Sequence, residues 1–90
     1  MKIRESDAKY WQVANEHHLD VRPILESGGE PYSVIMDAVN QLEQNHVLIL
    51  HAHFDPIPLK KQLDRMHYSH ESHKVEVDHW TIRIAQLEDV

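Results

Sequence analysis

A central strand is predicted by Val47–Phe54, eight residues that read VLILHAHF. Its first four residues are all apolar, which indicates a strand that is covered on at least one face. The next segment, Asp55-Pro56-Ile57-Pro58, predicts the start of a helix with Asp55 as its N-cap, because prolines are tolerated in a first turn whose N–H groups have no intrahelical partners. Three apolar residues supply the buried stripe of this helix, namely Leu59, Leu63 and Met66.

A strand and a helix are predicted before this stretch. His17–Val21 is a strand candidate that ends at Arg22-Pro23, because proline cannot donate to a sheet ladder. After a loop at Gly28-Gly29, Glu30-Pro31 opens a helix with Pro31 at the first helical position, and Asn45 is the expected stop. The apolar stripe of this helix consists of Tyr32, Ile35, Met36, Val39 and Leu42.

A hairpin is predicted after the second helix. Its arms are Tyr68–Val77 and His79–Leu87, with a turn near Asp78. Trp80, Ile82 and Ile84 alternate with polar residues, so one face of the last strand is buried. The element order is β-α-β-α-β-β, and right-handed crossovers place both helices on the same side. The sequence therefore predicts an α+β fold, a two-layer sandwich with two helices on one face of a four-stranded mixed sheet.

The composition indicates one soluble domain. A chain of 90 residues has room for one core, so we expect residues 17–90 to form the domain and residues 1–16 an N-terminal arm or leader. No run approaches the ~18 apolar residues of a membrane span, and the first residues do not resemble a signal peptide, so we expect a cytoplasmic protein without a membrane partner. A net charge of −6 argues against nucleic acid as a partner.

Cysteine and histidine usage narrows the chemistry further. The chain has no cysteine, which excludes disulfides, thiolate metal sites and a persulfide carrier. Its nine histidines change protonation around pH ~6.5, and full protonation would take the net charge from −6 to +3. Neither a serine nucleophile motif nor a glycine-rich phosphate loop is present in the sequence. We therefore expect no enzymatic activity.

Five short blocks in a fixed order resemble one bacterial family. The blocks are Leu19-Asp20-Val21-Arg22-Pro23, Pro31-Tyr32, Phe54-Asp55-Pro56-Ile57-Pro58-Leu59, Tyr68-Ser69-His70-Glu71, and Trp80 with Ile82. Together they run from Leu19 to Ile84 and are similar to domain-of-unknown-function family 2249. The resemblance implies a relation to the TusA/SirA sulfur carriers and to the two-layer fold of those proteins.

The chemistry of the sulfur carriers is not expected to transfer to this chain. Those proteins work through a Cys-Pro-x-Pro motif at the start of the first helix, where this chain has Gly29-Glu30-Pro31-Tyr32. Without a thiol, no persulfide can form. The family also occurs beside hemerythrin-like domains or among genes of nitrogen-oxide and redox metabolism, which implies an accessory role. His53 is a second departure, because the family resemblance implies a proline at this position.

Histidines two residues apart give a candidate metal site. His51 and His53 point to the same face of a strand, where two imidazoles can share Zn²⁺, Cu²⁺ or Ni²⁺ if a third ligand comes from a neighbouring strand. The available donors are His70 and His73 in the third strand, or Asp78 and His79 at the hairpin. The same histidines also fit solvated or hydrogen-bonded surface residues, or a pH sensor.

A second candidate site lies at the end of the first strand. Asp20 and Arg22 share one strand face near the carboxyl end of a parallel strand, where α/β sheets bind ligands. Arg22 would pair with an anionic ligand or a partner's carboxylate, or instead with an internal carboxylate that locks the loop. The expected binding surface for a partner or ligand consists of Asp20, Arg22, His51, His53, Asp55 and His70. Glu71 points to the opposite strand face and so cannot orient His70 as a general base.

These features predict a non-catalytic binding or adaptor module, with a histidine-based metal-binding accessory protein as the alternative. A sheet covered on one side leaves its second face free for a protein partner or a second copy. Exposed apolar residues on that face, Val47 and Ile49 with Val75 or Val77, would favour a homodimer or a docking surface. The sequence alone leaves open which residues of each strand face the helices.

Overall fold

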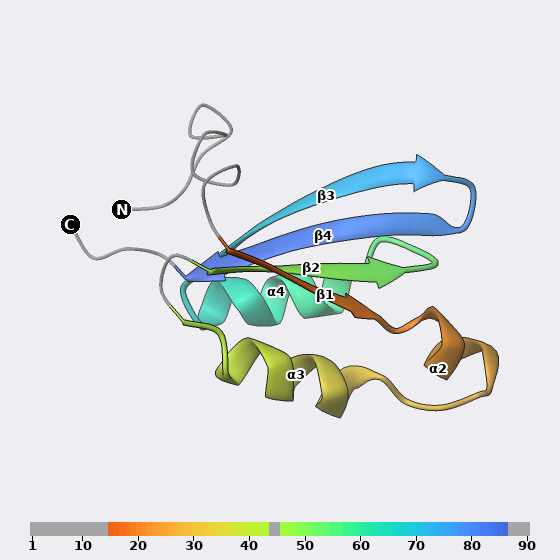
Figure 1. The fold of residues 1–90 in the computed structure, drawn as a ribbon, viewed down its shortest axis with the longest axis horizontal. Coiled ribbons are helices and arrows are strands. Elements are labelled where there is room, and N and C mark those ends of the chain that lie inside the picture. Colours follow the sequence, from red (N-terminus) through yellow and green to blue (C-terminus); the bar gives the residue numbers. More distant parts are fainter. Residues whose placement is uncertain (1–14, 44–45, 87–90) are drawn as a thin grey trace.

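Two layers make up the described chain, residues 15–43 and 46–86 of the computed structural model. The strands are β1 (Asn15–Asp20), β2 (His46–Ala52), β3 (Tyr68–Glu76) and β4 (His79–Gln86). The helices are α2 (Arg22–Glu26), α3 (Tyr32–Asn40) and α4 (Ile57–Arg65). The sheet order is β1-β2-β4-β3, with β1 parallel to β2 and β4 antiparallel to both neighbours, and α3 and α4 lie against one face (Figure 1). The predicted mixed sheet with helices on one side is confirmed.

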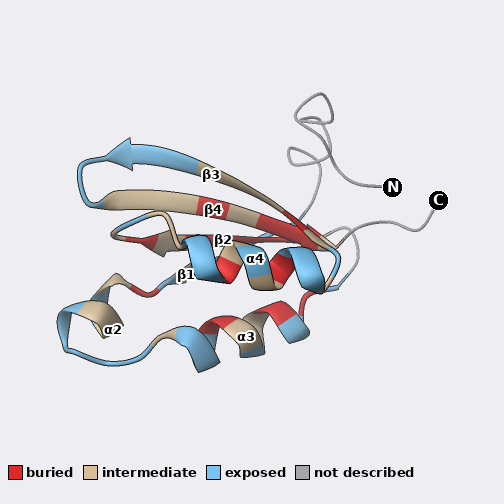
Figure 2. Ribbon diagram, turned by 180° about the vertical axis from the view of Figure 1, so that it is seen from behind, coloured by how far each residue is buried: buried red, intermediate tan, exposed pale blue. Residues whose placement is uncertain are grey.

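The core lies between the sheet and the two longer helices (Figure 2). Leu48 lies opposite Ile84, and Leu50 lies opposite Ile82, in the central β2–β4 pair. The helices add Ile35, Val39, Leu59 and Leu63 to the same buried cluster. Because full burial of such a side chain contributes about 1.5–3 kcal/mol, this cluster fixes which residues of each strand face the helices. Tyr32 was predicted for the same stripe but is exposed at the start of α3.

A short helix, α2, fills the segment between the first strand and the glycine loop. Its only proline, Pro23, lies in the first turn, where a missing N–H costs no hydrogen bond. Gly28 has a φ of 79°, its N–H donates to Leu25 O at 3.1 Å, and the N–H of Gly29 donates to Ile24 O at 2.8 Å. This pair of bonds is the Schellman arrangement that ends a helix, and it explains the position of the left-handed glycine.

Several predicted boundaries differ from the structure. Pro31 is the N-cap of α3 and not its first residue, α3 ends at Asn40, and the predicted stop at Asn45 lies outside the described residues. Asp55 is not the N-cap of α4, because Pro56 holds that position and the Asp55 carboxylate is bound elsewhere. The predicted arm, residues 1–16, also lies outside the described residues except for its last two, which begin β1.

Two of the apolar residues expected to be exposed on the helix-free face, Val47 and Ile49, are buried. Val47 and Ile49 do face this side, but only 0% and 4% of their surface is exposed. Arg83 of β4 and Glu16 of β1 form an ion pair of 3.1 Å that crosses β2 over these two residues, because Glu16 lies opposite Val47 and Arg83 lies opposite Ile49. Val47 and Ile49 are therefore covered within the chain, whereas Val75 and Val77 remain 52% and 77% exposed. No helix among the described residues is long and apolar enough to cross a membrane.

Candidate functional site

The strand register divides the histidines between the two faces of the sheet. His17 lies opposite Leu48 and so points to the helix side, whereas His18 lies opposite Ile49 and points to the helix-free side. His51 shares the helix-free side with Thr81, its partner in β4. Adjacent histidines in β1 therefore belong to two different clusters, and the pair cannot chelate one ion.

Three histidines form a hydrogen-bonded row on the helix-free face. Nδ1 of His18 is 3.0 Å from Nε2 of His51, and Nδ1 of His51 is 3.0 Å from Nε2 of His79. These side chains come from the adjacent strands β1, β2 and β4. The ring centres are 5.2 Å apart in both pairs. At a nitrogen–nitrogen distance of 3.0 Å, this separation is reached only when the two nitrogens point directly at each other. We call these three residues the imidazole row.

The two nitrogen–nitrogen contacts of the imidazole row limit how many protons the three rings can hold. Each N···N contact needs one proton, so the neutral row is satisfied when every ring donates in the same direction. One added proton can be held by His51, which then donates to both neighbours, but a second added proton places two N–H groups against each other. Burial lowers the pKa of His51; the charge on Asp20 opposes that shift, and His18 and His79 reinforce it.

Asp20 and Arg22 form an ion pair with each other beside the imidazole row. The Asp20 carboxylate accepts hydrogen bonds from Arg22 Nη2 at 2.7 Å, from Nε at 2.9 Å and from the backbone N–H at 3.0 Å. The side-chain hydrogen bond from Arg22 lowers the pKa of Asp20 to about 2. The sequence allowed Arg22 to bind either an external anion or an internal carboxylate. In the structure it binds the internal carboxylate of Asp20.

His53 lies beyond the last residue of β2 and joins two distant segments. Its Nδ1 donates to the backbone carbonyl of Asp78 at 2.9 Å, in the β3–β4 turn, and its Nε2 is 3.0 Å from the Glu26 carboxylate at the end of α2. Both partners are acceptors, so both contacts are hydrogen bonds only when the ring carries two protons. His53 and His51 consequently have separate partners, although both belong to the same end of the sheet.

Two of the predicted binding residues, Asp55 and His70, lie on the side of the sheet that is covered by helices. The Asp55 carboxylate accepts hydrogen bonds from Lys60 Nζ at 2.9 Å and from the Ser72 hydroxyl at 3.0 Å, which ties the β2–α4 loop to β3. His70 lies opposite Ile84 and contacts the Asp64 carboxylate of α4 at 2.9 Å. Asp55 and His70 are therefore not part of the surface formed by Asp20, Arg22 and His51.

The proposed metal ligands do not converge. His51 is in the imidazole row, His53 bridges Glu26 and Asp78, and His70 and His73 lie on opposite faces of β3. The ring of His73 contacts Glu71, its neighbour on the helix-free face. Among residues 15–43 and 46–86, no three or more His, Asp or Glu side chains form a group that could hold a metal ion.

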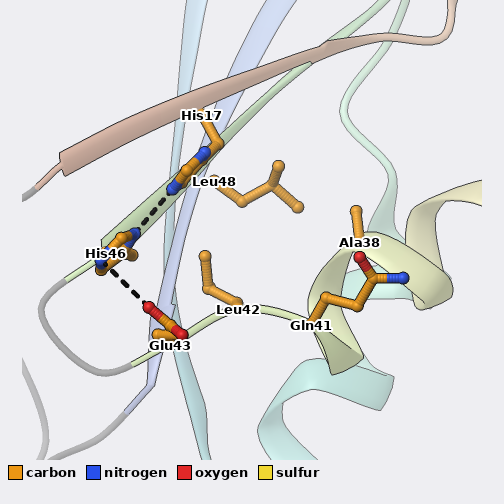
Figure 3. A pocket seen from close by; sticks show the side chains of 7 residues that line it. All are labelled: His17, Ala38, Gln41, Leu42, Glu43, His46 and Leu48. Atoms are coloured by element: carbon orange, nitrogen blue, oxygen red, sulfur yellow. Dashed lines mark hydrogen bonds and ion pairs between the residues drawn. The ribbon is translucent and has the colours of Figure 1, made fainter.

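A second histidine cluster, which the sequence did not predict, lies on the helix side of β1 (Figure 3). Nε2 of His17 is 2.6 Å from Nδ1 of His46, and Nε2 of His46 is 3.5 Å from the Glu43 carboxylate. The three side chains form a line at the wall of a cavity of about 250 Å³, whose apolar wall includes Leu42 and Leu48. The parallel register pairs His17 with Leu48, which places His17 and His46 on the same face of neighbouring strands. No local sequence pattern specifies this register, so the cluster could not be predicted.

The fold and the site define a small α+β protein whose histidine-bearing sheet face is free of helices. The sequence profile of the family described as "Uncharacterized conserved protein (DUF2249)" matches residues 18–86, so the chain belongs to this family. This match confirms the family resemblance seen in the motifs. Comparisons with curated proteins and with solved structures give no match.

Proposed function

We propose that this chain is a non-catalytic binding module of the cytoplasm that contacts a protein partner through the helix-free face of its sheet. The observation that carries the proposal is the concentration of partly exposed polar side chains on that face, next to the imidazole row. These side chains are Glu16, His18, Asp20, Glu71, His73 and Arg83. The opposite face of the sheet is already covered by α3 and α4.

The chemistry of the chain supports binding without sulfur transfer. A relation to the TusA/SirA carriers, with an accessory role in redox or nitrogen-oxide metabolism, is part of the proposal. The chain has no cysteine and therefore no thiol that could carry a persulfide. Arg22 is paired with Asp20, and Arg83 is paired with Glu16, so the face presents two ion pairs beside the imidazole row in a fixed arrangement. Such an arrangement gives a protein interface specificity and orientation.

Site-specific photo-crosslinking in the cells that produce the protein tests this proposal. A photoreactive phenylalanine analogue replaces His73, which is exposed on the helix-free face, and in a matched chain it replaces Arg65, which is exposed on α4. We expect a discrete crosslinked product from position 73 and none from position 65. Absence of a product at position 73, or the same product from both positions, would refute the proposed face.

A second candidate function is transition-metal binding by the three imidazoles of the imidazole row, which lie close together but do not form a metal-binding group in the arrangement described. They come from adjacent strands with nitrogens 3.0 Å apart. A shared Zn²⁺ would need ring rotation, because lone pairs must converge on a point about 2.0–2.1 Å from each nitrogen. An NMR titration with Zn²⁺ and Cu²⁺ tests this candidate. Saturation at one equivalent with shifts confined to His18, His51 and His79 supports it, whereas weak shifts over all histidines refute it.

A further inference from the structure

An apolar groove opens at the same end of the sheet, on the side of the helices. Its floor is formed where β1 and β2 end, at Val21 and Ala52, and its rim comes from the α2–α3 and β2–α4 loops. The groove has a volume of about 190 Å³. A cavity of ~150 Å³ is large enough to hold benzene, so there is room for one large apolar side chain.

Two aromatic residues at the groove are unusually exposed. Phe54 is 53% exposed and Tyr32 is 46% exposed, although both are large apolar side chains. Three prolines line the groove beside them, namely Pro31, Pro56 and Pro58. Prolines restrict the backbone of both loops, so little conformational entropy is lost when a ligand is bound. Exposed aromatic side chains around a preformed apolar hollow are typical of a protein interaction site.

The charge around the groove is negative. Glu30 is the one charged residue among the described residues that line it, and its carboxylate accepts a hydrogen bond from the backbone N–H of Tyr32, which holds it at the rim. Two cations close to the groove are paired internally, since Arg22 binds Asp20 and Lys60 binds Asp55, whereas Lys61 and Arg65 are exposed on α4 and do not line the groove. The whole chain carries a net charge of −6.

We propose that this groove is a second contact surface of the binding module, which takes an apolar side chain, aromatic or leucine, flanked by lysine or arginine in an exposed segment of a partner protein. The apolar side chain fills the hollow between Phe54 and Tyr32. A flanking cation pairs with Glu30. This inference rests on the proposed function only in that the chain binds a protein, because the groove and the helix-free face lie on opposite sides of the sheet.

A selection from a displayed library of random dodecapeptides on the full chain tests the groove. The expected consensus has one aromatic residue or leucine next to lysine or arginine. Phe54→Asp and Glu30→Lys should each weaken the selected peptide by roughly tenfold or more. Val75→Asp is the matched control, because Val75 is 52% exposed and lies away from the groove, and it should leave the affinity unchanged.

Several outcomes would overturn the proposal. They are the absence of a consensus, a consensus with acidic flanks, and a peptide that binds Phe54→Asp as tightly as the unaltered chain. If the NMR shifts of amides at the groove change with the concentration of the protein alone, the groove binds a second copy of this chain instead. Failure here together with a crosslink at position 73 removes the groove but leaves the helix-free face as the binding surface.

Discussion

At the scale of single residues, His51 is the most constrained titratable group of the site. It contacts an imidazole at each ring nitrogen, and burial lowers its pKa in the folded chain. As the pH falls, the unfolded chain therefore takes up this proton first. The contribution of His51 to stability is complete above pH ~6.5, the pKa of the unfolded chain, and is lost as the pH falls from there through the lower pKa of the folded chain. The lowered pKa of Asp20 acts only at much lower pH, toward about 2.

Thermal unfolding of the unaltered chain and of His51→Gln, between about pH 8 and about pH 5.5, measures this effect. We expect Tm to fall on acidification by more in the unaltered chain than in His51→Gln. His73→Gln is the control, since His73 is exposed and outside the imidazole row, and it should keep the full pH dependence. Equal pH dependence in all three chains would show that the imidazole row does not couple protonation to folding.

Gly28 gives a second prediction for a single residue. Its φ of 79° is in the left-handed region, and a side chain there would meet no neighbouring atom. Gly28→Ala should therefore cost about 1–2 kcal/mol of unfolding free energy from backbone conformation alone. Gly28→Asn should cost less, because asparagine adopts this conformation more readily. Urea unfolding measures both values, and equal losses for the two variants would contradict the backbone explanation.

At the scale of elements, Asp55 connects the β2–α4 loop to α4 and β3. Its two partners, Lys60 and Ser72, are both partly buried. Asp55→Ala should lower the free energy of unfolding by about 1–3 kcal/mol, because two hydrogen bonds to a charged group are lost. Asp37→Ala is the control, an exposed carboxylate on α3 whose loss should change stability by less than about 0.5 kcal/mol. Chemical unfolding checks both, and an equal effect would argue against the connecting role.

Periodicity predicted the elements well because local patterns encode burial. The alternation of Trp80, Ile82 and Ile84 gave the buried face of β4, and the spacing of Ile35 and Val39 gave the core stripe of α3. The partners of His51 could not be predicted in this way. They depend on the register of β1 and β4 against β2, which the turns and the whole core determine together. The N-cap prediction for Asp55 was wrong because the carboxylate has stronger partners in Lys60 and Ser72 than in free amides.

At the scale of the whole molecule, the histidines control the sign of the net charge. The chain carries −6 with neutral histidines, and nine added protons would make it +3. The imidazole row limits this reversal, because a second proton in the row places two N–H groups against each other in one of its two contacts. A polyanion should therefore be repelled near neutral pH and bound only weakly when the histidines are charged.

Chromatography on heparin at low salt checks this prediction at about pH 7.5 and about pH 5.5. We expect no retention at the higher pH and weak retention at the lower pH. Retention that persists at pH ~7.5 would mean that a local basic surface outweighs the net charge, and nucleic acid would then replace protein as the partner to be tested first.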